Sequence, residues 1–327
     1  MPETNIHFLV VGNQRLGTGH IYRSIIYRNE FNKLGFNCQT YYLKGDELVN
    51  DIYSSKNLSS IQVDSFKDGN TQNSANNIFI LDILDTSKEL IQTLKKNNKV
   101  ISFEDLGEGS SYADLVINAL YQQKEIKINH YYGHNYMELR EEFHELSYKT
   151  NHKVENIMIT FGGTDPTNST LKVLESIYGY CNSKRININV VNGPGYQFLK
   201  TLSKFPEINI QNNINNMAKT MTENDIVFCS AGRTIYELAS IGVPSIVITH
   251  NKRENSHLFA SQEYGFINLG LSKDLDYKEI LERFSSLVAD YKLRKHISNI
   301  MLENNLQEGK QRVIKLILNL INEKYHK

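Results

Sequence analysis

Short apolar runs rich in β-branched residues alternate with longer amphipathic segments along the chain, and no other feature constrains its fold as much. A short run of this kind between turn-forming residues predicts a buried strand, whereas apolar residues three or four apart over a longer segment predict a helix. Strands that alternate with helices build a parallel sheet covered on both faces. The sequence therefore predicts an α/β fold with doubly wound, Rossmann-like sheets.

The alternation runs through the chain twice, and a length of 327 residues also suits two domains. The strands expected in the first half are Ile6–Val11, Cys38–Leu43, Ile78–Leu81, Val100–Phe103 and Leu115–Ile117. The helices expected between them are Ile21–Leu34 and Ser87–Asn97. The strands expected in the second half are Ile157–Phe161, Ile186–Val191, Ile226–Cys229 and Ser245–Thr249. Its expected helices are Thr167–Tyr180, Thr234–Ile241 and Asn255–Tyr264.

A polar stretch separates the two halves, and Tyr148–Lys153 within it is typical of a linker. We expect an N-terminal domain over residues 1–147 and a C-terminal domain over residues 153–308. The amphipathic segment Gly309–Glu323 predicts a last helix, so that residues 309–327 pack on the domains. Two doubly wound domains are expected to hold a ligand at the carboxyl ends of their strands, in a crevice between them.

Composition excludes several classes of protein. The 36 basic residues balance the 36 acidic ones, which argues against a nucleic-acid-binding domain. The 3 cysteines have no CxxC spacing, so neither a zinc site nor a disulfide framework is expected. No apolar stretch approaches the roughly 20 residues that span a bilayer, and no signal peptide is recognisable. These features predict a cytoplasmic protein without stable membrane insertion.

A glycine-rich loop follows the first expected strand and contains Gly17, Gly19, His20 and Arg23. Glycines let the backbone approach a ligand, and the start of a helix presents free N–H groups to an anion. A histidine at this place suits a general base, because imidazole changes protonation near neutral pH. His20 could instead cap the helix or form a hydrogen bond within the loop.

Two loops of the second half mirror this arrangement. Gly162, Gly163 and Asp165 follow its first expected strand; they suit a ligand, and they equally suit simple turn chemistry. The second loop is the segment 230–234, which follows the expected strand Ile226–Cys229 and precedes a helix. The backbone N–H groups at Gly232, Arg233 and Thr234 suit a diphosphate, with added charge from the Arg233 side chain. Glu237 suits the hydroxyls of a ribose, or simply complements the helix dipole.

Other polar residues near expected strand ends are weaker candidates. The residues expected to face the ligand after strand Ser245–Thr249 are Asn251, Lys252, Arg253, Glu254 and Asn255. Asp105, in an acidic turn of the first half, could bind sugar hydroxyls or a metal, although such turns are usually just solvated.

The ordered set of motifs resembles nucleotide-sugar enzymes of the GT-B architecture. The nearest resemblance is to the UDP-sugar hydrolases of the pseudaminic-acid pathway and to related spore-coat polysaccharide proteins. A more distant one is to the N-acetylglucosaminyltransferase that completes the peptidoglycan lipid precursor. The motifs that carry it are Gly17-x-Gly19-His20-x-x-Arg23, Ala113–Asn118, Gly133-x-x-Tyr136-x-x-Leu139-Arg140-x-x-Phe143, Phe161-Gly162-Gly163-x-Asp165-Pro166, Ala231-Gly232-x-Thr234-x-x-Glu237 and Gly242-x-Pro244.

The resemblance implies roles for these residues. His20 corresponds to the histidine that activates water at the anomeric carbon, Glu237 to the ribose-binding glutamate, and the loop at Gly232 to the diphosphate site. The implied reaction needs no metal and releases UDP and a free 2,4-diacetamido-2,4,6-trideoxyhexose. One departure is that Asn251-Lys252-Arg253-Glu254 replaces the family's Asn-Gln pair, which predicts a more anionic sugar.

Alternatives stay open at this point. The chain could be a glycosyltransferase that moves the sugar to a polysaccharide, polyol or lipid acceptor. It could also be a non-catalytic nucleotide-sugar binder, or a partner subunit of a sugar-activating enzyme. A functional association with such an enzyme, a cytidylyltransferase, is a further expectation. The sequence leaves open whether the base is uracil or cytosine, which sugar is bound, and the oligomeric state.

Overall fold

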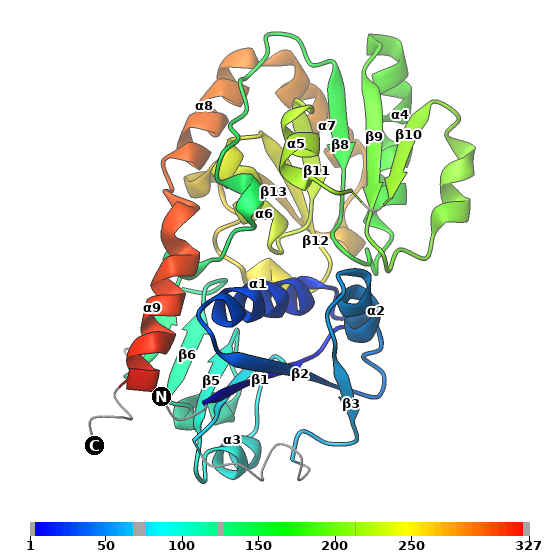
Figure 1. Ribbon diagram of the computed structural model, residues 1–327. Coiled ribbons are helices and arrows are strands. Elements are labelled where there is room, and N and C mark those ends of the chain that lie inside the picture. The colour runs from blue at the N-terminus through cyan, green and yellow to red at the C-terminus, as the bar shows by residue number, and fades with distance from the viewer. Residues whose placement is uncertain (1–3, 68–75, 123–126, 213, 323–327) are drawn as a thin grey trace. The chain divides into compact units, whose positions relative to one another are not determined.

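The computed structural model describes residues 4–67, 76–122, 127–212 and 214–322 (Figure 1). The chain divides into two compact units. The first unit comprises Met1–Glu138 and Glu308–Lys327, and the second comprises Leu139–Gln307. Each unit is built on one sheet, and the described strand pairings in both sheets are parallel. The prediction of two Rossmann-like α/β domains is confirmed.

The division between the units falls at Leu139, whereas the sequence predicted a linker at Tyr148–Lys153. That polar segment is held inside the second unit. The buried guanidinium of Arg294 donates hydrogen bonds to the carbonyl oxygens of Asn151 and His152, at 3.0 and 2.9 Å. These hydrogen bonds attach the segment to the second unit, although the side chains of Lys149 and of residues 151–153 are exposed.

The sheet of the first unit has the strand order β3-β2-β1-β4-β5-β6-β7. Its strands are β1 (Asn5–Val10), β2 (Asn37–Leu43), β3 (Ile61–Val63), β4 (Ile78–Asp82), β5 (Lys99–Phe103), β6 (Leu115–Asn118) and β7 (His130–Tyr132). Its α-helices are α1 (Gly19–Lys33), α2 (Leu48–Ser55), α3 (Lys88–Leu94) and α9 (Gly309–Asn322). The strands predicted for this half are confirmed with small shifts of their ends, and β3, β7 and α2 were not predicted.

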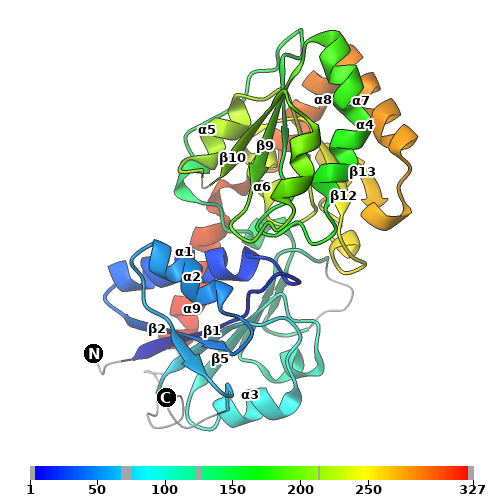
Figure 2. The same ribbon diagram turned by 90° about the vertical axis from the view of Figure 1, so that its right-hand side faces the viewer.

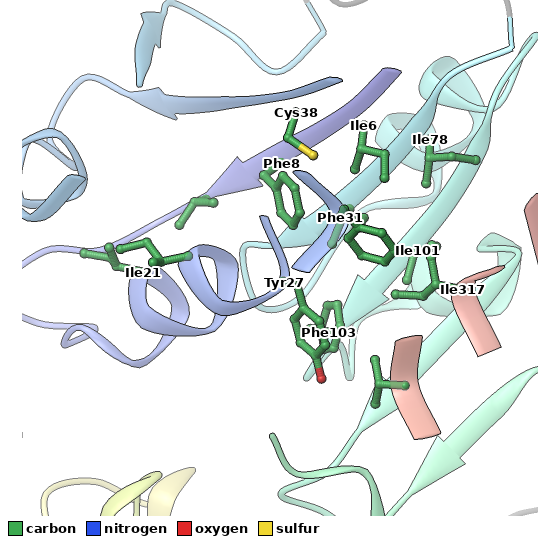
Figure 3. Packing of buried hydrophobic residues seen from close by; sticks show 14 of the residues in the cluster. Ile6, Phe8, Ile21, Tyr27, Phe31, Cys38, Ile78, Ile101, Phe103 and Ile317 are labelled. Carbon is green, nitrogen blue, oxygen red and sulfur yellow. The ribbon is translucent and has the colours of Figure 1, made fainter. Parts of the chain in front are cut away.

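Alternate residues of the strands face opposite sides of this sheet, and both sides are covered. Ile6 and Phe8 of β1 belong to a core shared with α1, α2 and α9, whereas Leu9 belongs to a second core under α3. Figure 2 shows α1 and α3 on opposite sides of the sheet. Figure 3 shows Phe31 of α1 and Ile317 of α9 beside strand residues of the first core. Burial on both faces explains why the central strands β1 and β4 are mostly apolar.

The last helix, α9, packs within the first unit, although it lies at the end of the chain. It begins at Gly309 as predicted, and Glu323, the predicted last residue, lies outside the described residues. Gly309 lies against the backbone of Met137, so that an added Cβ atom would be only 1.9 Å from the Met137 carbonyl oxygen. Backbone atoms cannot move aside as a side chain can. A glycine at the start of α9 is therefore required for this helix to dock.

We predict that Gly309→Ala destabilises the first unit by about 2–3 kcal/mol, because the methyl group overlaps the Met137 backbone. Differential scanning calorimetry, with hydrogen exchange of α9, measures this loss. The matched control is Gly179→Ala in helix α4 (Ser169–Lys184) of the second unit, where no atom lies within 4 Å of the added Cβ. It should stabilise by about 0.5–1 kcal/mol. A Gly309→Ala protein that unfolds like wild type contradicts the docking.

The sheet of the second unit has the order β10-β9-β8-β11-β12-β13. Its strands are β8 (Asn156–Ile159), β9 (Asn187–Asn192), β10 (Ile208–Asn212), β11 (Ile226–Cys229), β12 (Ser245–Thr249) and β13 (Phe266–Leu271). Its α-helices are α4 (Ser169–Lys184), α5 (Met217–Thr222), α6 (Thr234–Ile241), α7 (Tyr277–Ala289) and α8 (Tyr291–Leu302). Helix α4 packs against α7, and α6 packs against α5 and α8. The sequence predicted β11, β12 and α6 with these bounds but missed β10, β13, α5, α7 and α8.

The predicted helix Asn255–Tyr264 is wrong, because only the short 3₁₀ turns Glu254–Ser256 and Gln262–Tyr264 occur there. His257 interrupts the helix. Its side chain is buried, and Nδ1 lies 2.7 Å from the carbonyl oxygen of Ala231, to which it donates a hydrogen bond. Apolar residues at helical spacing predicted a helix here, but the tertiary contact of His257 decides the local backbone.

Both sheets have a point at which the order of the strands reverses direction. In the first unit it lies between β1 and β4, and in the second between β8 and β11. Because βαβ crossovers are right-handed, the helices that follow the two strands lie on opposite faces of the sheet at such a point. The loops after these strands therefore diverge and leave a place where α/β proteins bind ligands.

Candidate functional site

The loop after β1 and the end of β4 bring His20 and Asp82 together in the first unit. His20 is the second residue of α1, and Asp82 is the last residue of β4, where it pairs in register with Val10 of β1. His20 Nδ1 lies 2.5 Å from Asp82 Oδ1, and the two side chains are 12% and 2% exposed. His20 therefore does not cap its helix. It is oriented by a carboxylate on the neighbouring strand.

This contact determines which ring nitrogen of His20 is available. A carboxylate accepts a hydrogen bond, so the neutral imidazole donates its Nδ1 proton to Asp82 and keeps a lone pair on Nε2. We assign this tautomer from the hydrogen-bond network. A histidine held in this way can accept a proton at Nε2 and is then stabilised, as imidazolium, by the carboxylate behind it.

Arg23 binds the same carboxylate from the other side. Its Nε donates to Asp82 Oδ2 and its Nη2 donates to Asp82 Oδ1, both at 2.7 Å. Burial disfavours the charged form of Asp82, but the nearby Arg23 and His20 outweigh it and hold the pKa of this carboxyl well below its ordinary value. Asp82 is therefore a carboxylate throughout the neutral range, as an acceptor for His20 must be.

Glu104 completes this buried group of four side chains. It follows β5 directly and accepts a hydrogen bond from Arg23 Nη1 at 2.9 Å. The backbone N–H groups of Ala119 and Leu120 also donate to it, at 3.1 and 3.3 Å. Burial raises the pKa of Glu104 above its ordinary value, and Arg23 offsets only part of this effect.

The structure revises two expectations for the first unit. Arg23 was expected near a sugar, but it is 3% exposed and its guanidinium binds Asp82 and Glu104. Asp105 was expected at a sugar or a metal, but both of its oxygens accept hydrogen bonds from Thr86 and it stabilises a loop. The strand register places Glu104, and not Asp105, beside Arg23.

Three further candidates of the first unit form no side-chain contact with this group in the structure. Tyr136 packs on Tyr131, at a ring distance of 5.3 Å, and against the first core. Gly17 has a φ of 80°, a conformation that favours glycine, and Gly19 begins α1. The two glycines therefore shape the loop that leads to His20.

In the second unit, the loop after β8 is shaped by glycines and by Asp165. Gly162 has a φ of 75°, and the Gly163 carbonyl accepts a hydrogen bond from Gly195 N at 2.8 Å. The Asp165 carboxylate accepts hydrogen bonds from the N–H groups of Ser169 and Thr170, at 2.8 and 2.9 Å, at the start of α4. For Asp165 the geometry thus matches the turn chemistry that the sequence left as an alternative.

The loop after β11 leads directly into α6, so its backbone N–H groups and the helix N-terminus share one place. A Cβ atom added at Gly232 would meet only Glu254 Oε1 and Ser230 Oγ within 4 Å, both at 3.7 Å. The backbone at Gly232 is therefore open to a close approach. Arg233 and Thr234 lie at the start of the same helix.

Glu237 lies one turn into α6 and is held by Arg140, a residue that was not among the predicted site residues. Arg140 Nε donates to Glu237 Oε1 at 2.9 Å, and Arg140 also pairs with Glu142 at 3.0 Å. The Arg140 side chain is 28% exposed and that of Glu237 is 9% exposed. This ion pair orients a carboxylate close to the N-terminus of α6.

Glu254, whose Oε1 lies 3.7 Å from a Cβ atom added at Gly232, is held in a turn. Its Oε2 accepts a hydrogen bond from His250 N at 2.6 Å, and burial raises the pKa of its carboxyl group above the ordinary value. Asn251 accepts from Glu254 N at 3.0 Å, and Asn255 accepts from Thr249 at 3.2 Å, so the two amides shape this turn. Lys252 is exposed. The expectation of an anionic sugar, based on Lys252 and Arg253, stays a prediction.

Among the described residues, no group of three or more His, Cys, Asp and Glu side chains is placed to hold a metal ion. Within the same part of the chain, no helix combines the length and apolar character that crossing a membrane takes.

Comparison with known proteins finds a family model that matches the second half of the chain. Residues 156–317 match the family model of the glycosyltransferase family 28 C-terminal domain. An uncharacterised protein of Methanocaldococcus jannaschii is 33% identical over 272 residues, which are 76% of this chain but only 56% of that protein. The chain thus spans about half the length of this relative.

Two further relatives have names that state a process or an activity. A spore coat polysaccharide biosynthesis protein of Bacillus subtilis is 26% identical over 66% of this chain and 69% of its own length. The UDP-2,4-diacetamido-2,4,6-trideoxy-beta-L-altropyranose hydrolase of Campylobacter jejuni is 23% identical over 77% of this chain and 94% of its own length.

The solved structure of Acinetobacter baumannii MurG matches with a TM-score of 0.64 at 16% identity and covers 97% of this chain and 99% of its own. The chain therefore has the GT-B fold, and its residues 156–317 match the model of the glycosyltransferase family 28 C-terminal domain.

We predict that the second unit becomes less stable as the pH falls, because of His257. Burial lowers the pKa of His257 from 6.5 to about 4. Between these values the unfolded chain binds a proton that the folded chain does not. The stability is therefore present above pH 6.5 and is lost as the pH falls to about 4, by up to about 1.4 kcal/mol per pH unit.

The variant His257→Asn tests this pH dependence. Asparagine keeps a donor for the Ala231 carbonyl oxygen but does not titrate. Denaturant unfolding between pH 4 and 7 should show a flatter decline for the variant than for wild type. Equal slopes contradict a neutral, buried His257.

Proposed function

We propose that the protein is a nucleotide-sugar hydrolase that cleaves the bond between the anomeric carbon and the leaving nucleoside diphosphate. The observation that carries this proposal is the hydrogen bond from His20 to Asp82, which leaves Nε2 of a partly exposed histidine free to accept a proton. The relative from Campylobacter jejuni, named as a UDP-sugar hydrolase, supports the same reaction class. The proposed substrate is a UDP-amino sugar that resembles the one in that name.

In this reaction His20 Nε2 takes a proton from water while the water oxygen attacks the anomeric carbon. The bond from that carbon to the diphosphate oxygen breaks, and its electron pair leaves with the nucleoside diphosphate. Asp82 stabilises the imidazolium that forms, and it stays ionised because Arg23 neutralises its other side. The products are the free sugar and the nucleoside diphosphate, so atoms and charge balance without a further reactant.

The second unit is proposed to bind the nucleotide. The N–H groups at Gly232, Arg233 and Thr234 suit the diphosphate, because the N-terminus of α6 attracts negative charge. The Glu237 carboxylate, oriented by Arg140, accepts hydrogen bonds from the hydroxyl groups of the ribose. Helix α6 thus stabilises both ends of the leaving group with no metal in the scheme.

A glycosyltransferase is the second candidate, and the match of residues 156–317 to a glycosyltransferase domain favours it. In that case His20 Nε2 would take the proton of an acceptor hydroxyl and not of water. Association with a sugar-activating cytidylyltransferase and a cytoplasmic location also stay predictions.

We predict that the wild-type protein releases nucleotide from one or more members of a panel of UDP-, CDP- and CMP-sugars without an acceptor. His20→Ala should lower kcat about 10²–10⁴-fold, because it removes the general base. Asp82→Asn should lower kcat at least about tenfold, because an amide can present a donor to Nδ1 and favour the wrong tautomer. A coupled assay for free UDP, CDP or CMP measures both effects.

His130→Ala is the matched control, because His130 lies on β7 of the same unit and takes no part in the group at His20. It should keep the wild-type rate. Full activity of His20→Ala contradicts the proposed mechanism. If nucleotide is released only when an acceptor is added, the protein is a glycosyltransferase and not a hydrolase.

We predict that Glu237→Ala weakens binding of UDP or CDP about 10–100-fold, because the ribose loses a charged hydrogen-bond acceptor. Isothermal titration calorimetry measures this without turnover. Glu223→Ala, an exposed glutamate that follows α5 in the same unit, is the control and should bind like wild type. Equal affinity of Glu237→Ala and wild type contradicts the ribose role.

A further inference from the structure

Arg23 and Glu104 are almost completely buried beside Asp82, and the proposed chemistry gives Glu104 no role. The side chains of Arg23 and Glu104 are 3% and 1% exposed, so neither is placed to contact a substrate. Buried charges are costly unless they are paired, and removing one partner leaves the other uncompensated. Their presence beside His20 therefore calls for a role that acts through Asp82.

Arg23 can influence His20 in two opposite ways. Its Nη2 donates to Asp82 Oδ1 at 2.7 Å and lies 3.4 Å from His20 Nδ1. Asp82 requires a proton on Nδ1, whereas an N–H of Arg23 that pointed at Nδ1 would require a lone pair there. The second arrangement moves the ring proton to Nε2 and removes the base.

Glu104 determines which of these arrangements is adopted. Its Oε1 binds Nη1 of Arg23 at 2.9 Å, which leaves Nη2 and Nε directed at the two oxygens of Asp82. Two backbone N–H groups after β6 hold the Glu104 carboxylate in turn. The backbone of Glu104 has a φ of 53°, in the left-handed region that glutamate rarely adopts. Strained residues of this kind persist only where the surrounding contacts require them.

We propose that Glu104 is a positioning residue that, through Arg23 and Asp82, keeps the His20 ring proton on Nδ1 and the lone pair on Nε2. The effect on turnover rests on the proposed function, but the effect on the ring does not. Glutamine in place of Glu104 supplies no negative charge, and it has only one oxygen. If that oxygen accepts from Arg23, the NH₂ group faces the N–H of Leu120; if it accepts from Leu120, the NH₂ group faces Arg23. The guanidinium then turns toward His20.

The test is the ¹⁵N NMR spectrum of the histidine rings of the intact protein without substrate, in which the nitrogen shifts report the tautomer. The His20 signals are those lost in His20→Ala. Wild type should show the Nδ1–H tautomer, and Glu104→Gln should show a large Nε2–H population. With an active nucleotide sugar, kcat of Glu104→Gln should fall about tenfold at unchanged KM, as is typical for groups that orient a functional histidine from behind.

Asp114→Asn is the matched control, because Asp114 is a carboxylate of the same unit that is 10% exposed and whose partners are Lys95, Lys99 and Val100. It should leave the His20 tautomer and kcat unchanged. Arg23→Lys is the second variant, since a lysine ammonium is not held by Glu104 and both oxygens of Asp82 at once, and so can donate an N–H to His20 Nδ1. It should produce the same tautomer shift, and it decides the question if Glu104→Gln does not fold.

Unchanged His20 shifts in Glu104→Gln, or in Arg23→Lys if only that variant folds, overturn the proposal. A raised KM at unchanged kcat also overturns it, because Glu104 would then act on substrate binding. If wild type cleaves no nucleotide sugar while the tautomer shift occurs, the proposed function fails and the positioning role of Glu104 stands.

Discussion

The site in the first unit depends on one buried carboxylate, Asp82, which has two partners of different kinds. Its oxygen Oδ1 is shared between His20 and Arg23, and its oxygen Oδ2 is bound by Arg23. A lone carboxylate at this depth would be costly, and a fully neutralised one would orient a histidine poorly. The Arg23 ion pair keeps Asp82 ionised, and the parallel register of β1 and β4 places Asp82 next to the loop that carries His20.

The two units use the same topological device for different chemistry. At the reversal point of the first sheet, the loop after β1 presents a histidine; at that of the second, the loop after β11 presents backbone N–H groups and the start of α6. A general base and an anion site are complementary requirements for breaking a sugar–diphosphate bond. The match of residues 156–317 to the glycosyltransferase family 28 C-terminal domain agrees with the nucleotide binding proposed for the second unit.

The fold was largely predictable because buried parallel strands leave a strong apolar pattern. The glycines of the loop after β1 made His20 a candidate, and its role stays a prediction. Asp82 was missed because it ends an apolar strand and looks like part of it. Its contact with His20 depends on β4 lying beside β1, and a linear pattern does not reveal which strands are neighbours. Arg23 and Asp105 were assigned to a ligand because the sequence does not reveal that tertiary contacts bury their side chains. The helix predicted at 255–264 and the linker predicted at 148–153 failed for the same reason, because side-chain bonds to distant backbone carbonyls determine both segments.

The central claim is that water activated by His20 attacks the anomeric carbon. The most direct test is turnover of an active nucleotide sugar in H₂¹⁸O, followed by mass spectrometry of both products. The account predicts one ¹⁸O atom in the released sugar and none in the nucleoside diphosphate, because the bond to the anomeric carbon breaks. Label in the phosphate would contradict it, since cleavage would then occur at phosphorus, where His20 and Asp82 have no assigned role.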